Sequence, residues 1–216
     1  MRQIAKLQEP ASLTAHRQAA HSNFGNYQAK DELRANLVRE QGALCCYCMR
    51  RIYVGSTLMK IEHWQSQDNF PDEQLGYLNL LGGCKGGEGN PLTLQHCDTR
   101  KGEADLRWNP ADPAHHIETR ISYGLDGTIA SSEQVFNDQL NNVLNLNLPV
   151  IKNNRKGVLT GLLDWFKRER NRLRGPIPRI SIERQIEQWT GQAHDRPAYG
   201  QVAVWWLQQK LSRMDR

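Results

Sequence analysis

CCYCMRRIYVGSTLMKIEHWQSQDNFPDEQLGYLNLLGGCKGGEGNPLTLQHCDTRKG, residues 45–102, is the stretch that decides the fold of this chain. It holds all five cysteines of the 216-residue sequence and shows no sustained helical period. Cys45 and Cys48 form a C-x-x-C pair, a spacing that lets two thiolates from one tight turn reach a single tetrahedral ion. Cys84 and Cys97 could supply the other two ligands, so the stretch predicts a four-sulfur structural Zn²⁺ site.

The exact ligand set stays open on sequence alone. Cys46 is a fifth thiol, and His96 could replace one cysteine, because an imidazole nitrogen is an equally good zinc donor. The separation of the last two cysteines exceeds the usual two-residue spacing, so an inserted glycine-rich loop is expected between them. That loop lacks the Gly-Lys-Ser/Thr ending of a phosphate-binding P-loop. Inert buried cysteines are the alternative, and the clustering disfavours it.

A carboxylate and an imidazole stand side by side at Glu62 and His63. Adjacent residues on an extended strand point to opposite faces, so one side chain could hold a metal ion while the other handles a proton. Hydrolysis of a phosphodiester needs a base for water and a divalent cation at the phosphate. The side chain of a free histidine has a pKa of about 6.5, so a neutral base is available at cell pH.

The order of these groups resembles that of the zinc-containing HNH nucleases. A C-x-x-C pair is followed by Glu62-His63, then Asn79, then Cys84 and the segment that begins at Cys97. In that family, two strands and a helix form a ββα-metal fold bracketed by cysteine pairs. The resemblance implies that His63 is the general base, that Glu62 binds a catalytic Mg²⁺ or Mn²⁺ ion, and that Asn79 braces the loop and orients the histidine.

The predicted helix after the last cysteine departs from the family pattern at one position. Asp98 stands where the family usually has Asn or His, and its hard oxygen donors suit Mg²⁺ or Mn²⁺, so it is the second expected catalytic ligand. Arg100 and Lys101 follow it. They are expected either to face the phosphate of a nucleic acid or to be ordinary solvated surface residues.

The rest of the sequence predicts mainly helices. Apolar spacing predicts a helix at about residues 31–41, and a turn at 124–127 predicts a short β-hairpin within 117–129. After Ser131, apolar residues recur at three-to-four spacing. We therefore expect an α+β fold, mainly α-helical, with a zinc-braced ββα-metal core. Three divisions are expected. Residues 1–42 form an N-terminal helical segment, and residues 43–108 form an HNH nuclease core with structural zinc. Residues 109–216 form a hairpin plus helical C-terminal region that binds a partner or nucleic acid.

Basic residues concentrate between Lys152 and Arg179. Nine basic residues oppose two acidic ones there, a local balance of +7 that exceeds the +5 of the whole chain. Such a cluster attracts a phosphate backbone through counterion release, although charged runs are often only solvated helix faces. A partner protein could use the same region, where Trp189, Trp205 and Trp206 are anchors or core residues. The candidate nucleic-acid-binding residues are Lys167, Arg168, Arg170 and Arg172.

Composition and a second motif indicate the cellular location and the partners of the protein. No run of about 18 apolar residues occurs, and Met1 is not followed by a signal-peptide stretch, so we expect a cytoplasmic protein without membrane association. The residues VLNLN at 143–147, followed by Arg155, are similar to the C-terminal part of a bacterial HNH family of antiphage systems, the Septu type and Septu modules of retrons. This resemblance implies a separate ABC/SMC-like ATPase subunit as partner and, in retron-associated systems, a reverse transcriptase with its RNA and DNA.

The sequence thus predicts a metal-dependent endonuclease that hydrolyses phosphodiester bonds, the effector of a defence complex. The substrate, DNA or RNA, stays open. The alternative is a non-catalytic zinc module that binds nucleic acid or the ATPase. A zinc-dependent deaminase is disfavoured, because its His-x-Glu motif would precede the cysteine pair, and the order here is reversed.

Overall fold

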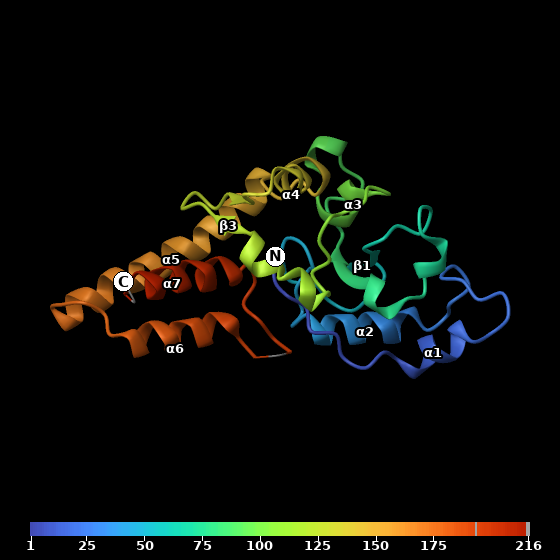
Figure 1. Ribbon diagram of the computed structural model, residues 1–216, viewed down its shortest axis with the longest axis horizontal. Helices are drawn as coiled ribbons and strands as arrows, with labels where there is room; N and C mark the ends of the chain where they lie inside the picture. The colour runs from blue at the N-terminus through green and yellow to red at the C-terminus, as the bar shows by residue number, and fades with distance from the viewer. Residues whose placement is uncertain (193, 215–216) are drawn as a thin grey trace.

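The computed structural model describes residues 1–192 and 194–214, and the chain forms an elongated α+β molecule (Figure 1). The expected fold class is confirmed. In these ranges, no helix is long and apolar enough to cross a membrane. The strands form two antiparallel pairs, β1 (Met59–His63) with β2 (Leu80–Cys84) and β3 (Ser122–Tyr123) with β4 (Ile129–Ala130). The α-helices are α1 (Ala11–Arg17), α2 (Lys30–Glu40), α3 (Cys97–Lys101), α4 (Gln134–Asp138), α5 (Pro149–Leu173), α6 (Arg179–Thr190) and α7 (Gln201–Met214).

The strands β1 and β2 and the helix α3 form a ββα unit within residues 43–108. In the antiparallel pair, Glu62 of β1 lies opposite Leu81 of β2. Every residue of β2 is buried, and both α2 and α3 contact this strand. A Cβ atom added at Gly83 would lie 3.7 Å from the Cβ atoms of both Glu62 and Asp98. The beginning of α3 therefore lies beside the end of β1, across the backbone of β2.

The N-terminal segment packs directly against this unit. The helix expected at about residues 31–41 is α2, and Gly42 follows it with a φ of +63°. Leu33 and Leu37 of α2 are fully buried in one cluster with Leu80 of β2. No pattern in the sequence predicted α1, a helix of only 7 residues. The hydrophobic core therefore continues across position 42.

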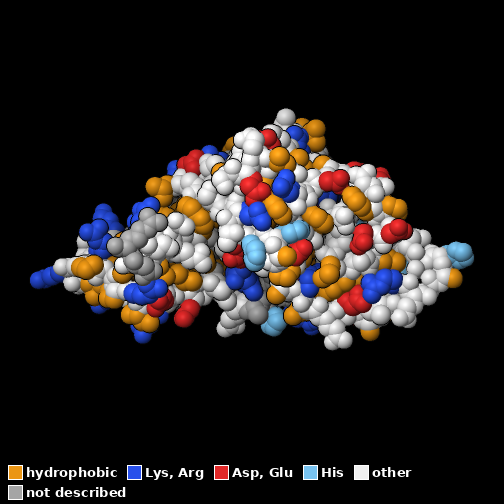
Figure 2. Space-filling view, viewed as in Figure 1, with side chains coloured by type: hydrophobic (Ala, Val, Ile, Leu, Met, Phe, Trp, Pro, Cys, Tyr) orange, Lys and Arg blue, Asp and Glu red, His pale blue; other side chains and the backbone are white. Residues whose placement is uncertain are grey.

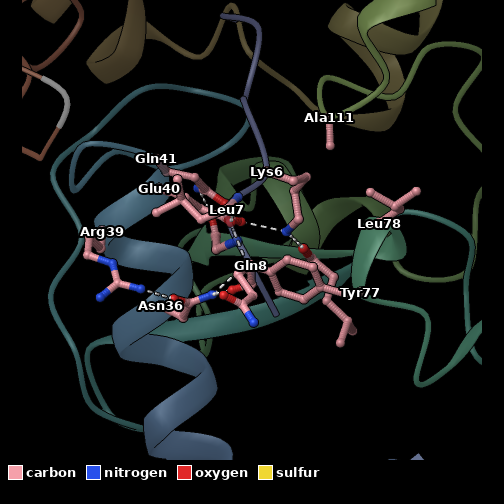
Figure 3. Close-up of polar contacts among 12 residues, drawn as sticks. Lys6, Leu7, Gln8, Asn36, Arg39, Glu40, Gln41, Tyr77, Leu78 and Ala111 are labelled. Carbon is pink, nitrogen blue, oxygen red and sulfur yellow. Dashed lines mark hydrogen bonds and ion pairs between the residues drawn. The ribbon is translucent and has the colours of Figure 1, made fainter. Parts of the chain in front are cut away.

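A buried polar network fastens the chain before α1 to α2 and β2 (Figure 3). The Nζ atom of Lys6 lies 2.5 Å from Oε1 of Glu40 and donates to the carbonyl of Leu80 at 2.8 Å. The hydroxyl of Tyr77 donates to the other oxygen of Glu40 and accepts from Nδ2 of Asn36. Burial lowers the pKa of Lys6, and the charge of Glu40 opposes this shift. The negative charge of Glu40 thus offsets part of the hydration free energy that the Lys6 ammonium loses on burial.

The strands β3 and β4 form the hairpin predicted within residues 117–129. Its tip lies on α5, and Gly127 there has a φ of +85°. A Cβ at Gly127 would be 2.2 Å from the carbonyl oxygen of Lys152, so no other residue fits this contact. Arg155 of α5 is 3% exposed and donates from Nε to the carbonyl of Gly127 at 2.6 Å. This arginine of the basic segment is therefore an internal support of the hairpin.

The helices α5, α6 and α7 form one end of the molecule, and the ββα unit lies toward the other (Figure 1). Trp205 and Trp206 pack against the main core, and Trp189 packs against the smaller core between these helices. Of the two alternatives that the sequence left open for these tryptophans, the structure shows core packing. The main core contains both Leu81 of β2 and Leu159 of α5, so it also continues across position 108.

Candidate metal centre and active site

Four buried cysteine side chains converge beside the ββα unit. The Sγ atoms of Cys45, Cys48, Cys84 and Cys97 all lie within 4.8 Å of one another. The first and last of these are 3.9 Å apart, and the middle two are 3.8 Å apart. A tetrahedral ion with Zn–S bonds of about 2.3 Å needs sulfurs about 3.8 Å apart. The four thiols therefore fit a Zn²⁺ ion.

The two other candidate ligands lie outside this four-sulfur set. Nδ1 of His96 is 3.1 Å from Sγ of Cys97 and 4.0 Å from Sγ of Cys84, a position for a hydrogen bond to sulfur. Cys46 is buried, and burial is the main cause that raises the pKa of its thiol. It stays a neutral core residue.

Two turns bring the sulfurs together. Around the C-x-x-C pair, the backbone N–H of Met49 donates to the carbonyl of Cys45 at 3.1 Å, which closes the first turn. The long connection at residues 85–96 is the glycine-rich insertion expected from the sequence. It is closed by the N–H of His96, which donates to the carbonyl of Gly86 at 2.8 Å. The last two cysteines thus become neighbours despite their separation in sequence.

A cavity of about 380 Å³ lies beside β1 and the start of α3. Glu62, His63 and Asp98, three of the predicted catalytic residues, all line it. Phe24 and two cations of α2 line it from the N-terminal segment. The cavity therefore collects carboxylates, an imidazole and cations around one space.

Glu62 is a buried carboxyl with a second carboxyl beside it. Burial is the main cause that raises its pKa, and a hydrogen bond with Asp98 adds to the shift. The ammonium of Lys101, 3.1 Å from Oε1, and the hydroxyl of Tyr47, which donates to the same oxygen at 2.6 Å, compensate only in part. Lys60 lies 3.3 Å from the carboxylate of Asp98. Because the nearby lysines do not fully compensate the negative charge of these two carboxylates, their oxygen atoms suit a divalent cation.

His63 has a defined ring orientation. Its Nε2 atom is 3.0 Å from the carbonyl oxygen of Gln74. Because a carbonyl can only accept, Nε2 carries the hydrogen, and Nδ1 is the basic nitrogen of the neutral ring. Burial lowers the pKa of His63, and the bond to Gln74 opposes this shift. The ring is therefore neutral over a wider pH range than a free histidine.

Asn79 joins the two ends of the loop that follows β1. Its Oδ1 accepts from the N–H of Gln65 at 2.7 Å, and its Nδ2 donates to the carbonyls of Gln65 and Glu73 at 3.0 Å each. Glu73 is the neighbour of Gln74, whose carbonyl holds His63. The position of Asn79 is thus that of a brace for the histidine, away from the cavity itself.

Comparison with known proteins shows a distant similarity. No protein-family model matches the chain. Over 127 residues, which is 56% of this chain, the sequence is 27% identical to the Septu protein PtuB of Bacillus thuringiensis. The matched region covers 44% of that protein, less than half of its length. At 127 residues, the similarity extends beyond the 58 residues of the cysteine-containing stretch 45–102.

The basic candidates have different surroundings. Lys101 is 4% exposed, and its ammonium also donates to the carbonyl of His63 at 3.0 Å, so it supports the site from inside. Arg100 donates to the carbonyls of Leu92 and Asn142 and lies outside the residues that line the cavity. On α5, the four predicted nucleic-acid-binding residues are all exposed: Lys167, Arg168, Arg170 and Arg172.

Sequence reasoning missed one support of Glu62 and several residues that line the cavity. Tyr47 lies inside the C-x-x-C pair, and its hydroxyl reaches Glu62 because the tight turn faces β1. Phe24, Lys30 and Arg34 come from a segment about 30 residues upstream of β1 and reach the cavity only through packing of α2. No local motif marks them, so a spacing pattern could not have found them.

Proposed function

We propose that this chain is a metal-dependent endonuclease of the HNH type, which hydrolyses phosphodiester bonds of DNA or RNA. One observation carries the proposal: Glu62, His63 and Asp98 line a single cavity on a ββα unit flanked by four clustered cysteines. A base and two hard oxygen ligands around one space are what phosphodiester hydrolysis requires.

The two metals have different roles in this proposal. The four cysteines would hold a Zn²⁺ ion, which would tie the connection at residues 85–96 to the start of α3 as a structural support. Glu62 and Asp98 would hold Mg²⁺ or Mn²⁺, which supplies charge stabilisation at the phosphate when bound. Lys60, Lys101 and Tyr47 keep the two carboxyl groups in place.

His63 acts as the general base. Nδ1 accepts a proton from water as the water oxygen bonds to phosphorus. The bond from phosphorus to the leaving oxygen breaks, its electron pair stays on that oxygen, and the oxygen takes a proton from solvent. The hydrogen bond from Nε2 to Gln74 holds the ring in the required tautomer, and Asn79 braces the loop that carries this carbonyl.

The biological setting is proposed from the similarity to the Septu protein PtuB. The chain would be the nuclease subunit of a Septu-type antiphage complex in the cytoplasm, regulated by an ABC/SMC-like ATPase subunit. In a retron-associated system, a reverse transcriptase with its RNA and DNA would be a further partner. The similarity supports the defence role, since it covers more than half of the chain.

The test is cleavage of labelled DNA and RNA pools by the purified chain, alone and with the ATPase encoded beside it. We expect products in Mg²⁺ or Mn²⁺ and none in EDTA or with Glu62→Gln. The matched control is Glu187→Gln, an exposed carboxylate on α6. A protein that retains zinc and binds nucleic acid but cleaves nothing under any of these conditions would instead be the non-catalytic zinc module.

A further inference from the structure

The N-terminal segment contributes one wall of the cavity. Lys30 and Arg34 of α2, one turn apart, and Phe24 before the helix line the same space as Glu62 and His63. Phe24 meets the ring of His63 edge-on, with centroids 4.4 Å apart. The proposed catalytic base is therefore in direct contact with the segment expected from the sequence to be a separate N-terminal part.

Arg34 carries a donor without a partner. Its side chain is 14% exposed, and Nη1 donates to Asp31 at 2.6 Å. Its Nε atom is buried and has no hydrogen-bond partner. A buried donor left unpaired costs free energy, and the side chain that carries this donor lines the cavity, so an acceptor bound there would relieve part of that cost. Guanidinium donors match the oxygens of a phosphate in geometry and charge.

Lys30 adds a second cation on the same wall. Its Nζ atom lies 4.9 Å from the centre of the Phe24 ring and donates to the carbonyl of Gly25 at 3.2 Å. These are neutral partners, which leave its charge uncompensated. Phe24 thus lies between a cation and the ring of His63.

The acidic groups of the cavity are distributed differently. Glu62 and Asp98 come from β1 and α3, and Lys101 and Lys60 pair with them. Glu103 also lines the cavity and is exposed. On α2, Asp31 is mostly exposed and holds only one nitrogen of its arginine. The carboxyl groups that could hold a metal thus come from β1 and α3, whereas the two lining residues of α2 are both cations.

We propose that Arg34, together with Lys30, binds a phosphate of the substrate strand on the α2 wall while the scissile phosphate lies at Glu62 and Asp98. The inference rests on the proposed nuclease function and names its substrate contact, a phosphodiester strand of DNA or RNA. It makes α2 a wall of the active site.

The test measures binding without cleavage. Short fluorescein-labelled DNA and RNA strands are titrated with the His63→Asn protein in Mg²⁺ by fluorescence anisotropy over a series of salt concentrations. Adding Arg34→Ala should weaken binding about tenfold and reduce the salt slope by about one. Arg34→Lys should restore the salt slope. The matched control is Arg39→Ala, an exposed arginine of the same helix outside the cavity lining, which should change neither quantity.

The outcomes separate this inference from the nuclease proposal. If Arg34→Ala binds as Arg39→Ala does while the otherwise unmodified chain cleaves, the phosphate contact is wrong and the nuclease stands. If the unmodified chain cleaves nothing but Arg34→Ala weakens binding, the phosphate contact stands without the nuclease. In a cleaving protein, we expect Arg34→Ala to raise KM more than it lowers kcat. Thermal unfolding of both variants identifies any loss caused by misfolding.

Discussion

The ammonium of Lys101 is the main internal counter-charge of the candidate active site. Both it and the carboxyl of Glu62 are 1% exposed as side chains, and they lie 3.1 Å apart. Removing one member of such a buried pair leaves the other charge without compensation, which usually costs more free energy than removing both.

We therefore expect Lys101→Met to lower the free energy of unfolding by about 3 kcal/mol. The double variant with Glu62→Gln should lose less than the single variant, because the uncompensated carboxylate is gone. Urea denaturation of the four proteins of this cycle measures the coupling. Equal losses in the single and double variants would show that Lys101 does not act through Glu62.

At the scale of residues, local sequence was enough to propose three residues: Glu62 and His63 stand side by side, and Asp98 directly follows Cys97. The structure brings these three side chains to one cavity. The burial of Lys101 could not be predicted, because it depends on how α3 rotates against β2. Arg34 was missed for a similar reason, since its position is a product of tertiary packing.

In the connection between β2 and α3, the closest approach of backbone to a glycine is at Gly86. Gly86 has a φ of +56°, and a Cβ there would lie 2.1 Å from the carbonyl oxygen of His96. Gly89, in the same connection, also has a positive φ, of +84°, but nothing lies within 4 Å of its Cβ position. Both glycines therefore have a positive φ, but only at Gly86 would a side chain also clash with a backbone oxygen.

We expect Gly86→Ala to separate the last two cysteines and to lower the zinc content of the purified protein severalfold. Gly89→Ala should keep its zinc and lose only about 1 kcal/mol of stability, the cost of a left-handed alanine. Zinc per chain is measured by atomic emission after dialysis. Equal zinc in both variants would contradict the role given to this turn.

At the scale of elements, the amphipathic helix α2 and the hairpin β3–β4 were predictable because their periodicity and turn residues are local. The helical turn at Gln139–Val143 was not, since it is a π-helix in which the N–H of Leu144 donates to the carbonyl of Gln139. Its wider turn is decided by packing rather than by an apolar repeat.

The whole molecule separates its basic surface from its candidate active site. The end of α5 lies far from β1 and α3, and Lys and Arg side chains gather at that end (Figures 1 and 2). Among the described residues, Lys167, Arg168 and Arg170 form no ion pair, whereas Arg172 pairs with Glu169 at 2.5 Å. The number of these charges could be read from the sequence, but their positions on the surface could not. Because Arg155 is buried, the surface charge of residues 152–179 is lower than the +7 counted from the sequence.

If nucleic acid spans both regions, the triple variant Lys167→Ala, Arg168→Ala, Arg170→Ala should weaken binding and reduce the salt slope by about three. The value of kcat at saturating substrate should stay unchanged, because none of the three residues lines the cavity. Binding and steady-state cleavage measure the two effects. An unchanged salt slope, with loss of ATPase-subunit binding instead, would assign this end to the protein partner.

The most direct test of the account is cleavage of labelled nucleic acid in Mg²⁺ by the His63→Asn protein, compared with His21→Asn. Asparagine puts an amide in the place of Nδ1, which cannot act as a base, and its shorter side chain also gives up the hydrogen bond to Gln74, so zinc content and thermal unfolding serve as the folding controls. His21 is exposed and has a φ of +59°, a conformation that asparagine tolerates. We predict that His63→Asn loses at least about 100-fold in kcat with zinc content unchanged, and that His21→Asn cleaves normally. Full activity of His63→Asn would contradict the account.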